Sequence, residues 1–519
     1  MKLVNAGLVA TLLFAGCSGP AVDLAGQTPS SVATNGTGAE RPNVIVLYAD
    51  DLGYGDLSSY GHPNIATPNL DALAASGQRW TNFYAPAPVC SPSRGALLTG
   101  RLPNRTGLYG KRIRVMFPDD PNSMPSEEVT LAEALGEAGY ATAILGKWHL
   151  GDDPAAYPTR HGFDYWFGLP YSNDMDWVGT FTFTDRLKAL ASGKGLTAAQ
   201  EAESAARIGK YADPKIEYWN VPLIRSERAT AGAEYRDSIV ERPAQQPTLT
   251  ARYTQEALDF IDRTHSPAKA TGERRPFFVY LPYTMPHTPL FASTHFQNKS
   301  RGGVYGDVVE EIDASVGQIV KGLAARGLTR DTLVIFTSDN GPWLAMLQRG
   351  GSAGLLRSGK GTTFEGGMRV PAIFSQPGTI APGVVHDIGS GLDLLPTVLN
   401  MAGIAPSTAV LDGVDLTAPL TGQGASVRKN IAYYREGSLM AWRHGDWKLH
   451  LVIQGAYGQG PELEALETPL LYHLGEDPAE RFDVAADNPA VVEMITAKIA
   501  AHRAEFVDAP ALFDLRLGQ

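Results

Sequence analysis

The sequence predicts an α/β protein with a mostly parallel mixed β-sheet flanked by helices, followed by a small C-terminal antiparallel sheet with one helix. Two observations predict this fold. Between residues 42 and 428, short apolar and β-branched runs alternate with amphipathic segments, the pattern of a sheet that is covered by helices on both faces. From residue 429 to residue 519, short strand-like runs follow one another and a single helical segment comes last.

The elements of the first region can be placed from local patterns. The run Asn43–Tyr48 predicts a buried strand, and Thr67 followed by Pro68 predicts a helix start with Thr67 as its N-cap. Apolar residues at helical spacing between Val309 and Leu323 predict a long amphipathic helix. Three further runs predict strands, at residues 141–145, 276–281 and 332–337.

The last region, residues 429–519, has a different order of predicted elements. Four short runs predict strands, at residues 431–434, 439–442, 447–452 and 470–474. Residues 490–506 then predict a closing helix. With 519 residues, 44% hydrophobic and 19% charged, the chain is long enough for a large domain over 42–428 and a small α+β subdomain over 429–519.

The N-terminus resembles an export signal. Residues 1–17 have a basic start and a short apolar run, which is too short to span a bilayer and predicts a signal peptide. Small residues before Cys17 resemble a bacterial lipobox, which makes Cys17 a candidate for lipidation, with plain secretion as the alternative. Residues 18–41 are rich in Gly, Ser, Thr, Ala and Pro and predict a flexible tether. We therefore expect an exported bacterial protein, periplasmic or anchored to the outer membrane as a lipoprotein.

The charge of the chain restricts its partners. The formal net charge is −11, which argues against nucleic acid or an anionic membrane surface as a partner. After the signal peptide there is no apolar stretch of membrane-spanning length, so we expect membrane contact only through an N-terminal lipid anchor. Any anion site must be a local basic cluster inside an acidic protein.

Cys90 is the only cysteine of the predicted folded body. A lone cysteine is usually a small buried hydrophobic residue. Here it opens the run Cys-Ser-Pro-Ser-Arg-Gly-Ala-Leu-Leu-Thr-Gly-Arg, which places Pro92 two residues and Arg94 four residues after it. This run resembles the modification site of a known protein family, and that resemblance favours a modified residue over a packing role.

Carboxylates follow two of the predicted strands. Asp50 and Asp51 come directly after the first strand, and Asp339 and Asn340 come after the strand at 332–337. In open α/β sheets, functional groups gather at the carboxyl ends of strands. Four hard oxygen ligands suit Ca²⁺ or Mg²⁺ and lack the imidazole or thiolate that zinc prefers. Each motif by itself is equally typical of a turn.

Cationic side chains follow further strands. Lys147 and His149 stand two residues apart, on the same side of the backbone if it stays extended. His287 follows the strand at 276–281, and Lys360 lies in a glycine-rich loop. Singly, a histidine at a strand end is more often structural and a loop lysine is usually solvated. Together they predict the local basic cluster that an anion requires.

The amino-acid sequence of these segments resembles that of the type I, formylglycine-dependent sulfatase family, and within it the arylsulfatase A-like branch. The resemblance runs from about residue 42 to residue 480 and is carried by six segments: 49–56, 67–71, 90–101, 139–151, 337–341 and 360–371. It implies an alkaline-phosphatase-like core and a catalytic sulfatase domain over 42–428. It also implies hydrolysis of sulfate monoesters, either aryl sulfates or sulfated carbohydrates.

The resemblance implies a nucleophile and a metal. Cys90 would be oxidised to formylglycine by a formylglycine-generating or equivalent maturation enzyme. Its hydrate would attack sulfur, form a covalent enzyme–sulfate intermediate and then eliminate inorganic sulfate. A Ca²⁺ ion, in preference to Mg²⁺, would be bound by Asp50, Asp51, Asp339, Asn340 and the modified residue 90.

The remaining roles are implied in the same way. Arg94 would hold the side chain of residue 90, and Lys147 would bridge it to the sulfate. His149 would take the proton from the second hydroxyl. His287 and Lys360 would bind sulfate beside the leaving oxygen, where a cation and donors stabilise developing charge. Ser172 would make a further sulfate contact.

The substrate stays open at this stage. An insertion from Asp176 to about Arg242 carries several aromatic residues, which either line a pocket for a ring-shaped aglycone or sugar or pack the insertion onto the core. These residues are Trp177, Phe181, Phe183, Tyr211, Tyr218 and Trp219. Export favours a sulfated glycan over a small sulfated molecule as the partner. Two alternatives are a phosphate or phosphonate ester hydrolase of the same fold, and a binding protein whose cysteine is never modified.

Overall fold

The computed structural model describes residues 41–517 except 194, 229–233, 266–274 and 407–408. The predicted signal peptide with Cys17, and the tether up to residue 40, lie outside the described residues. From Arg41 onward the chain forms one compact unit. None of the helices described in it is both long and apolar enough to cross a membrane.

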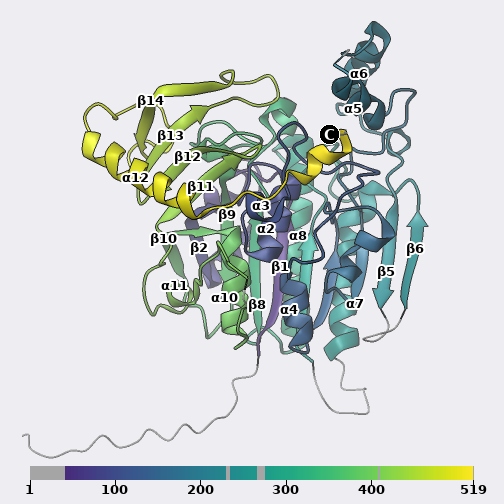
Figure 1. Ribbon diagram of the computed structural model, residues 1–519. Helices are drawn as coiled ribbons and strands as arrows, with labels where there is room; N and C mark the ends of the chain where they lie inside the picture. The colour runs from purple at the N-terminus through teal and green to yellow at the C-terminus, as the bar shows by residue number, and fades with distance from the viewer. Residues whose placement is uncertain (1–40, 194, 229–233, 266–274, 407–408, 518–519) are drawn as a thin grey trace, which may run out of the picture. The chain divides into compact units, whose positions relative to one another are not determined.

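A ten-stranded mixed sheet forms the centre of this unit, in the order β10-β2-β9-β8-β1-β7-β3-β4-β5-β6 (Figure 1). The neighbours β8, β1, β7, β3 and β4 run parallel, whereas β9, β5 and β6 pair antiparallel. The prediction of a mostly parallel mixed sheet is therefore confirmed. Its strands are β1 (Asn43–Ala49), β2 (Gln78–Tyr84), β3 (Ala141–Leu145), β4 (Tyr165–Gly168), β5 (Leu223–Arg228), β6 (Tyr235–Glu241), β7 (Phe277–Pro282), β8 (Thr332–Ser338), β9 (Arg369–Ser375) and β10 (Gly383–Ser390).

Helices cover both faces of this sheet, because alternate residues of a strand point to opposite sides. Ile45 and Leu47 of β1 join the core cluster that includes residues of α1, α7 and α8. Val44 and Val46 join the cluster that includes residues of α2, α4 and α10. The helices are α1 (Pro68–Ser76), α2 (Cys90–Thr99), α3 (Pro103–Thr106), α4 (Leu131–Glu137), α5 (Phe183–Ala191), α6 (Ala198–Lys210), α7 (Leu249–His265), α8 (Gly303–Ala325), α9 (Glu365–Met368), α10 (Leu394–Met401), α11 (Thr417–Thr421) and α12 (Pro489–Glu505).

The predicted helix start at Thr67 is found in place, with one local difference. Helix α1 begins at Pro68, but the Thr67 side chain makes no capping bond to the helix backbone. Its hydroxyl instead donates to the Asp71 carboxylate at 3.2 Å.

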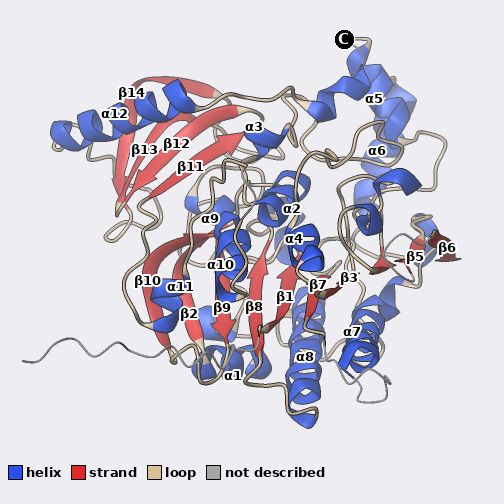
Figure 2. Ribbon diagram, turned by 60° about the horizontal axis from the view of Figure 1, so that its bottom comes forward, coloured by secondary structure: helices blue, strands red, loops and turns tan. Residues whose placement is uncertain are grey.

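A second, antiparallel sheet has the order β11-β12-β13-β14, and α12 packs against it. Figure 2 shows it beyond the carboxyl ends of the parallel strands. Its strands are β11 (Asn430–Arg435), β12 (Ser438–His444), β13 (Trp447–Ile453) and β14 (Glu464–His473). β14 starts six residues earlier than residue 470 because the mostly exposed segment 464–469 pairs with β13 after a register shift. The small sheet with one helix is confirmed, while a domain boundary at 428/429 stays a prediction.

The insertion after Asp176 folds into α5, α6, β5 and β6. Tyr211 and Trp219 are buried in the same core cluster as α7 and α8, and Trp177 and Tyr218 pack against that cluster. These four rings therefore fix the insertion to the core. The side chain of Phe183 lies outside the described residues.

Candidate active site

Two adjacent parallel strands deliver the predicted carboxylates to one point. β1 and β8 pair in a register that places Ala49 beside Ser338. The residues that follow each strand therefore meet, and the backbone N–H of Asp51 donates to Asp339 Oδ1 at 3.1 Å. Asp50 and Asp339 are fully buried. Ligand atoms of Asp50, Asp51, Cys90 and Asp339 all lie within 4.8 Å of one another.

Cys90 is the first residue of α2, and its side chain is buried among these groups. Its Sγ lies 3.4 Å from Asp50 Oδ1 and 3.5 Å from Lys360 Nζ. Burial raises the pKa of the Cys90 thiol well above its ordinary value, and the charge of Asp339 raises it further. The unmodified side chain is therefore a neutral thiol, a poor nucleophile at neutral pH.

Arg94 lies one helical turn after Cys90 and is fully buried. Its Nε and Nη2 donate to Asp339 Oδ2 at 3.0 and 2.8 Å. Its Nη1 donates to the backbone carbonyl of Lys147 at 3.0 Å. Arg94 thus joins α2, the carboxylate after β8 and the loop after β3. Its expected role in holding a modified residue 90 stays a prediction.

The loop after β3 places Lys147 against the carboxylates. Gly146 has φ 138°, and a Cβ there would come within 1.9 Å of the carbonyl oxygen of Pro282, so only glycine fits. Lys147 Nζ then lies 2.6 Å from Asp50 Oδ2. Lys147 and Arg94 hold the pKa of Asp50 well below its usual range although burial opposes them.

His149 does not continue an extended strand, because its φ is 63°. Its Nε2 lies 2.9 Å from the backbone carbonyl of Met116. A carbonyl only accepts, so Nε2 carries the proton and Nδ1 holds a lone pair. Nδ1 is buried, and no described residue forms a hydrogen bond with it. Burial, with Lys147 and Arg94, lowers the pKa of His149 well below its ordinary value, which keeps the ring neutral and able to accept a proton.

Lys360 and His287 approach from the other side of the carboxylates. Lys360 Nζ lies 2.8 Å from an oxygen of Asp51, and His287 Nε2 lies 3.7 Å from Asp51 Oδ2. The Nδ1 of His287 lies 2.6 Å from the backbone carbonyl of Thr288. Burial and the charge of Lys360 lower the pKa of His287. The four predicted cationic residues and Arg94 thus surround three carboxylates.

Ser172 is buried, and its Oγ has no hydrogen-bond partner among the described residues. The segment before it runs beside the Lys147 loop, since Trp148 N and His149 N donate to the carbonyls of Leu169 and Pro170. A buried hydroxyl without a partner is uncommon in a folded protein. This one is therefore available to a ligand.

The carboxylates at this point fit a divalent cation. Burial and the neighbouring charge of Asp50 raise the pKa of Asp339 to about 7, so the site does not readily hold three negative charges by itself. Asn340 Oδ1 is buried and receives no hydrogen bond from any residue that the structure describes. A cation would offset the carboxylate charge and satisfy this oxygen. Apart from the sulfur of unmodified Cys90, every donor of the set is an oxygen, as Ca²⁺ and Mg²⁺ prefer.

Two aromatic residues that the sequence did not indicate adjoin this cluster. The Trp343 ring lies 5.3 Å from the ring of His287, and Lys360 Nζ lies 4.8 Å from the Trp343 ring centre. The Tyr457 ring lies 5.2 Å from Trp343. Trp343 could have been noticed because it comes two residues after Gly341 of the Asp-Asn-Gly motif. Tyr457 has no local signal.

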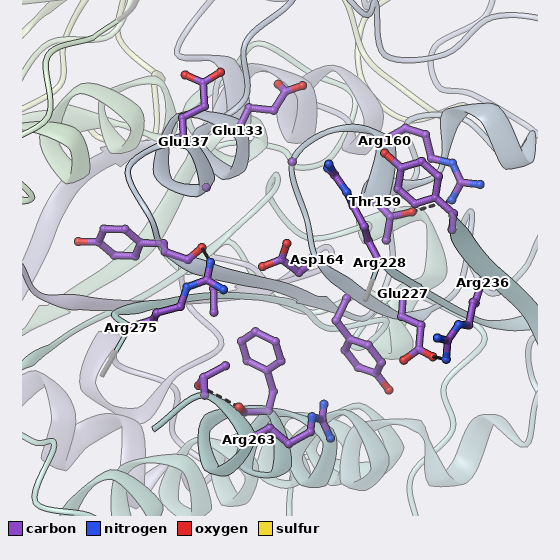
Figure 3. A pocket seen from close by; sticks show the side chains of 18 residues that line it. Glu133, Glu137, Thr159, Arg160, Asp164, Glu227, Arg228, Arg236, Arg263 and Arg275 are labelled. Carbon is purple, nitrogen blue, oxygen red and sulfur yellow. Dashed lines mark hydrogen bonds and ion pairs between the residues drawn. The ribbon is translucent and has the colours of Figure 1, made fainter. Parts of the chain in front are cut away.

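A cavity of about 850 Å³ lies at the amino ends of β3 and β4, whereas the candidate site lies at the carboxyl ends of the parallel strands (Figure 3). Its walls are rich in arginine, but several are already engaged. Arg160 pairs with Asp237, and Arg275 donates to the backbone carbonyls of Gly139 and Tyr140. None of the predicted site residues lines this cavity.

Comparison with known proteins assigns the family. The sulfatase family model matches residues 42–404, and the model of the C-terminal region of aryl-sulfatase matches residues 426–516. The chain belongs to the sulfatase family and is a sulfuric ester hydrolase. This confirms the family and class of enzyme expected from the sequence.

Individual relatives support the assignment. Arylsulfatase A of Homo sapiens is 40% identical over 480 residues, which cover 88% of this chain and 87% of the human protein. N-acetylgalactosamine-6-sulfatase of Rattus norvegicus is 40% identical over 469 residues, covering 85% and 81%. The crystal structure of the PsFucS1 sulfatase from Pseudoalteromonas sp. matches with a TM-score of 0.73 at 29% identity, covering 89% of this chain and 91% of that one.

Proposed function

We propose that the protein hydrolyses sulfate monoesters of an aryl alcohol or a carbohydrate with a formylglycine made from Cys90. In this scheme sulfate first becomes bonded to residue 90 and is then eliminated as inorganic sulfate. One observation carries the proposal: donor atoms of Asp50, Asp51, Cys90 and Asp339, from three separate parts of the chain, lie within 4.8 Å of one another. The two carboxylate motifs are almost 290 residues apart in sequence.

The thiol of Cys90 stands where the oxygens of the hydrated aldehyde would be. When formed, that hydrate supplies one hydroxyl to attack sulfur and a second whose deprotonation expels the product. A neutral, buried thiol offers neither. Maturation therefore requires a formylglycine-generating or equivalent enzyme as a partner.

The cationic residues receive the sulfate and the charge that develops on it. Lys147 Nζ and Lys360 Nζ approach the carboxylates from opposite sides, at 2.6 Å from Asp50 and 2.8 Å from Asp51. They offset the charges of those two carboxylates, as Arg94 does for Asp339. A bound divalent cation would then provide the net positive charge that an anionic ester requires. Lys360 donates toward the leaving oxygen, and preorganised donors of this kind are usually a large catalytic factor. His287 Nδ1 donates to the carbonyl of Thr288, so His287 would donate toward the leaving oxygen from Nε2 only in its protonated form. Ser172 Oγ provides a further donor.

His149 serves as the base in this scheme. The carbonyl of Met116 holds the proton on Nε2, so the proton from the second hydroxyl would be taken by Nδ1. The low pKa of His149 keeps that nitrogen free at neutral pH. Arg94 positions Asp339 and the Lys147 loop, and holds residue 90 through them.

A Ca²⁺ ion, in preference to Mg²⁺, would be held by Asp50, Asp51, Asp339, Asn340 and the modified residue 90. Such an ion supplies a positive charge that polarises sulfate oxygens. The orphaned Asn340 Oδ1 and the raised pKa of Asp339 support its presence.

The phosphate or phosphonate ester hydrolase of the same superfamily is less well supported. A second donor set, Asp51, Cys90 and His287, also lies within 4.8 Å. Its mixture of sulfur, nitrogen and oxygen suits Zn²⁺, but only while residue 90 is a thiol. A thiol at residue 90 would favour Zn²⁺ and phosphate ester hydrolysis, whereas formylglycine would favour Ca²⁺ and sulfate ester hydrolysis.

Export belongs to the same proposal. We infer from residues 1–41 a signal peptide with a lipobox, lipidation at Cys17 and a tether, which would place a sulfatase domain over 42–428 and a subdomain over 429–519 in or beyond the periplasm. A sulfated glycan is then the natural substrate.

One experiment tests the function. The protein is purified from a host with a maturation enzyme, and mass spectrometry of the peptide containing residue 90 is combined with metal analysis. Sulfate, phosphate and phosphonate esters are then assayed before and after chelation. We expect formylglycine, bound calcium and a preference for sulfate esters that chelation abolishes. Normal sulfate ester turnover by demonstrably unmodified protein, or a preference for phosphate esters with bound zinc, would overturn the proposal.

A further inference from the structure

Three rings lead outward from the candidate site to the protein surface. His287 and Trp343 have ring centres 5.3 Å apart, and Trp343 and Tyr457 have ring centres 5.2 Å apart. Trp343 is partly exposed, and Tyr457 is 38% exposed. The rings come from the loops after β7 and β8 and from the loop between β13 and β14. The first and second sheets therefore both contribute to this aromatic wall, which consists of Trp343 and Tyr457.

The aromatic wall adjoins the groups that would bind the leaving oxygen. Lys360 Nζ lies 4.8 Å from the Trp343 ring centre and 3.5 Å from Cys90 Sγ. Attack on sulfur from residue 90 expels the leaving group on the side away from it. A leaving group beside His287 and Lys360 therefore has Trp343 as its next contact.

The position of Tyr457 is held by several contacts. Its loop is fixed by Arg435, whose Nη1 donates to the carbonyl of Gly455 at 2.9 Å. The guanidinium of Arg114 lies 5.4 Å from the Tyr457 ring centre. Gly361 has φ 83°, and a Cβ there would come within 2.9 Å of the Tyr457 ring, so the residue next to Lys360 must be small.

Tyr457 also has a φ of 53°, which is costly for a side chain of its size. A strained residue persists where surrounding structure holds it, and such residues are frequent at ligand sites. An exposed aromatic ring in a strained, braced loop beside the site is thus better explained by ligand contact than by packing.

Resting on the proposed function, we propose that Trp343 and Tyr457 bind the leaving group of the sulfate ester and select for a six-membered ring. The ring's flat face packs on Trp343, and Tyr457 closes the outer side. Aryl and pyranosyl rings share this chemistry, because both present an apolar face that aromatic side chains contact well. A linear alkyl chain presents no such face.

The test compares three sulfate esters that differ only in the leaving group: nitrophenyl sulfate, sulfated N-acetylgalactosamine and octyl sulfate. We expect Trp343→Ala to lower kcat/KM for at least one ring substrate about tenfold relative to octyl sulfate, as for the loss of one aromatic contact. Trp343→Phe should keep most of the preference. Phe482→Ala, which removes a 61% exposed ring in the segment between β14 and α12, is the matched control and should change none of the three.

The outcomes separate the proposal from the function beneath it. A loss confined to one ring substrate supports the proposal and identifies the class of leaving group. An equal loss on octyl sulfate, or no loss, overturns the proposal while sulfatase function stands. A wild-type enzyme that carries formylglycine at residue 90 and cleaves none of the three esters overturns the proposed choice of leaving group. Failure of the proposed function itself would show instead as protein without formylglycine and calcium. If Trp343→Ala does not fold, Tyr457→Ala with Tyr457→Phe as its control carries the same test.

Discussion

Two buried charged clusters each take a residue from the segment 360–365, Lys360 in one and Glu365 in the other. Their polar atoms are satisfied to different degrees. The first, the site cluster, contains the carboxylates after β1 and β8 and the polar residues around them: Lys147, His149, Ser172, His287, Asn340 and Lys360. The second, the Glu365 cluster, joins α9 to the small sheet through Glu365, Lys448, His450 and Glu480. Both are removed from solvent.

In the Glu365 cluster, the charges are paired and hydrogen-bonded. Glu365 Oε1 accepts from Lys448 Nζ at 3.0 Å and from the Tyr433 hydroxyl at 2.7 Å, and Oε2 accepts from the Tyr84 hydroxyl at 2.6 Å. Lys448 Nζ also lies 2.9 Å from Glu480 Oε1 and donates to the carbonyl of Thr363 at 2.8 Å. The ammonium thus has three acceptors, which is its full capacity.

The site cluster is incomplete by the same measure. Asn340 Oδ1, Ser172 Oγ and His149 Nδ1 are buried and have no hydrogen-bond partner in the part of the chain that the structure describes. The Glu365 cluster leaves His450 Nδ1 in that state, but its carboxylates and ammonium are complete. Buried polar groups without partners are costly. We infer that a charged cluster whose polar atoms all have partners stabilises the fold. In a cluster of similar charge, the polar atoms without partners indicate where the ion, the substrate and the transferred proton would bind.

The largest expected effect comes from Cys90→Ser, which removes the residue to be oxidised. We expect kcat/KM for a sulfate ester to fall by more than about 10³, as for loss of a catalytic nucleophile. The melting temperature should stay close to that of the wild type, because Cys90 makes no strong bond to the core. Steady-state assays and calorimetry on the same preparation measure both. A large fall in melting temperature would place Cys90 among the structural residues.

Lys448→Met should have the opposite effect, a large loss of stability with little loss of activity. It leaves Glu365 and Glu480 buried without their shared cation, and breaking a buried ion pair costs about 3–5 kcal/mol. Urea unfolding should show that loss of stability. At low temperature, where the protein is still folded, kcat/KM should remain within a few-fold of wild type. A variant of normal stability and greatly reduced activity would show that the Glu365 cluster acts in catalysis.

Lys360→Ala removes a buried ammonium from the site cluster, as Lys448→Met does from the Glu365 cluster, so the two variants can be compared directly. We expect kcat/KM to fall at least about 10², the size of one lost electrostatic donor, with a smaller loss of stability than Lys448→Met. The reason is that a divalent cation can take over the charge of Asp51, whereas nothing replaces Lys448. Equal losses of stability in the two variants, with normal turnover by folded Lys360→Ala, would assign Lys360 a structural role.

The smallest effect concerns pH. Burial lowers the pKa of His450 although Glu480 opposes it, so the folded protein keeps this ring neutral where the unfolded chain takes up a proton. Stability should therefore fall as the pH drops through about 6.5, the ordinary histidine value. His450→Gln should weaken this dependence by about 1 kcal/mol at about pH 5.5. Identical pH profiles of urea unfolding for variant and wild type would contradict the assignment.

Much of the candidate site could be predicted from the sequence because its residues follow strands. Asp50 and Asp339 directly follow β1 and β8, and the parallel pairing of those strands brings them together whatever the length of chain between them. Cys90 was marked by the residues around it, and the family assignment follows from the same segments. The order of the strands did not need to be known.

Side-chain direction could not be predicted in the same way. Lys147 and His149 would share one side of an extended backbone, but His149 has φ 63° and its Nε2 turns to the carbonyl of Met116. Backbone geometry in a loop depends on close contacts such as that of Gly146 with Pro282, which join segments distant in sequence. Residues 464–469, which lengthen β14, were not predicted as a strand because they are polar. They form a strand because their backbone pairs with β13.

By itself, the sequence determined the class of fold, the family and the residues that carry the chemistry, because periodicity and short motifs are local properties of the chain. Only the tertiary structure decided that Glu365, Lys448 and Glu480 form a complete network, and that Tyr457 of the second sheet reaches Trp343 beside Lys360. The physical reason is that such contacts depend on packing between segments about a hundred residues apart, and no local pattern records which buried charge will find its partner.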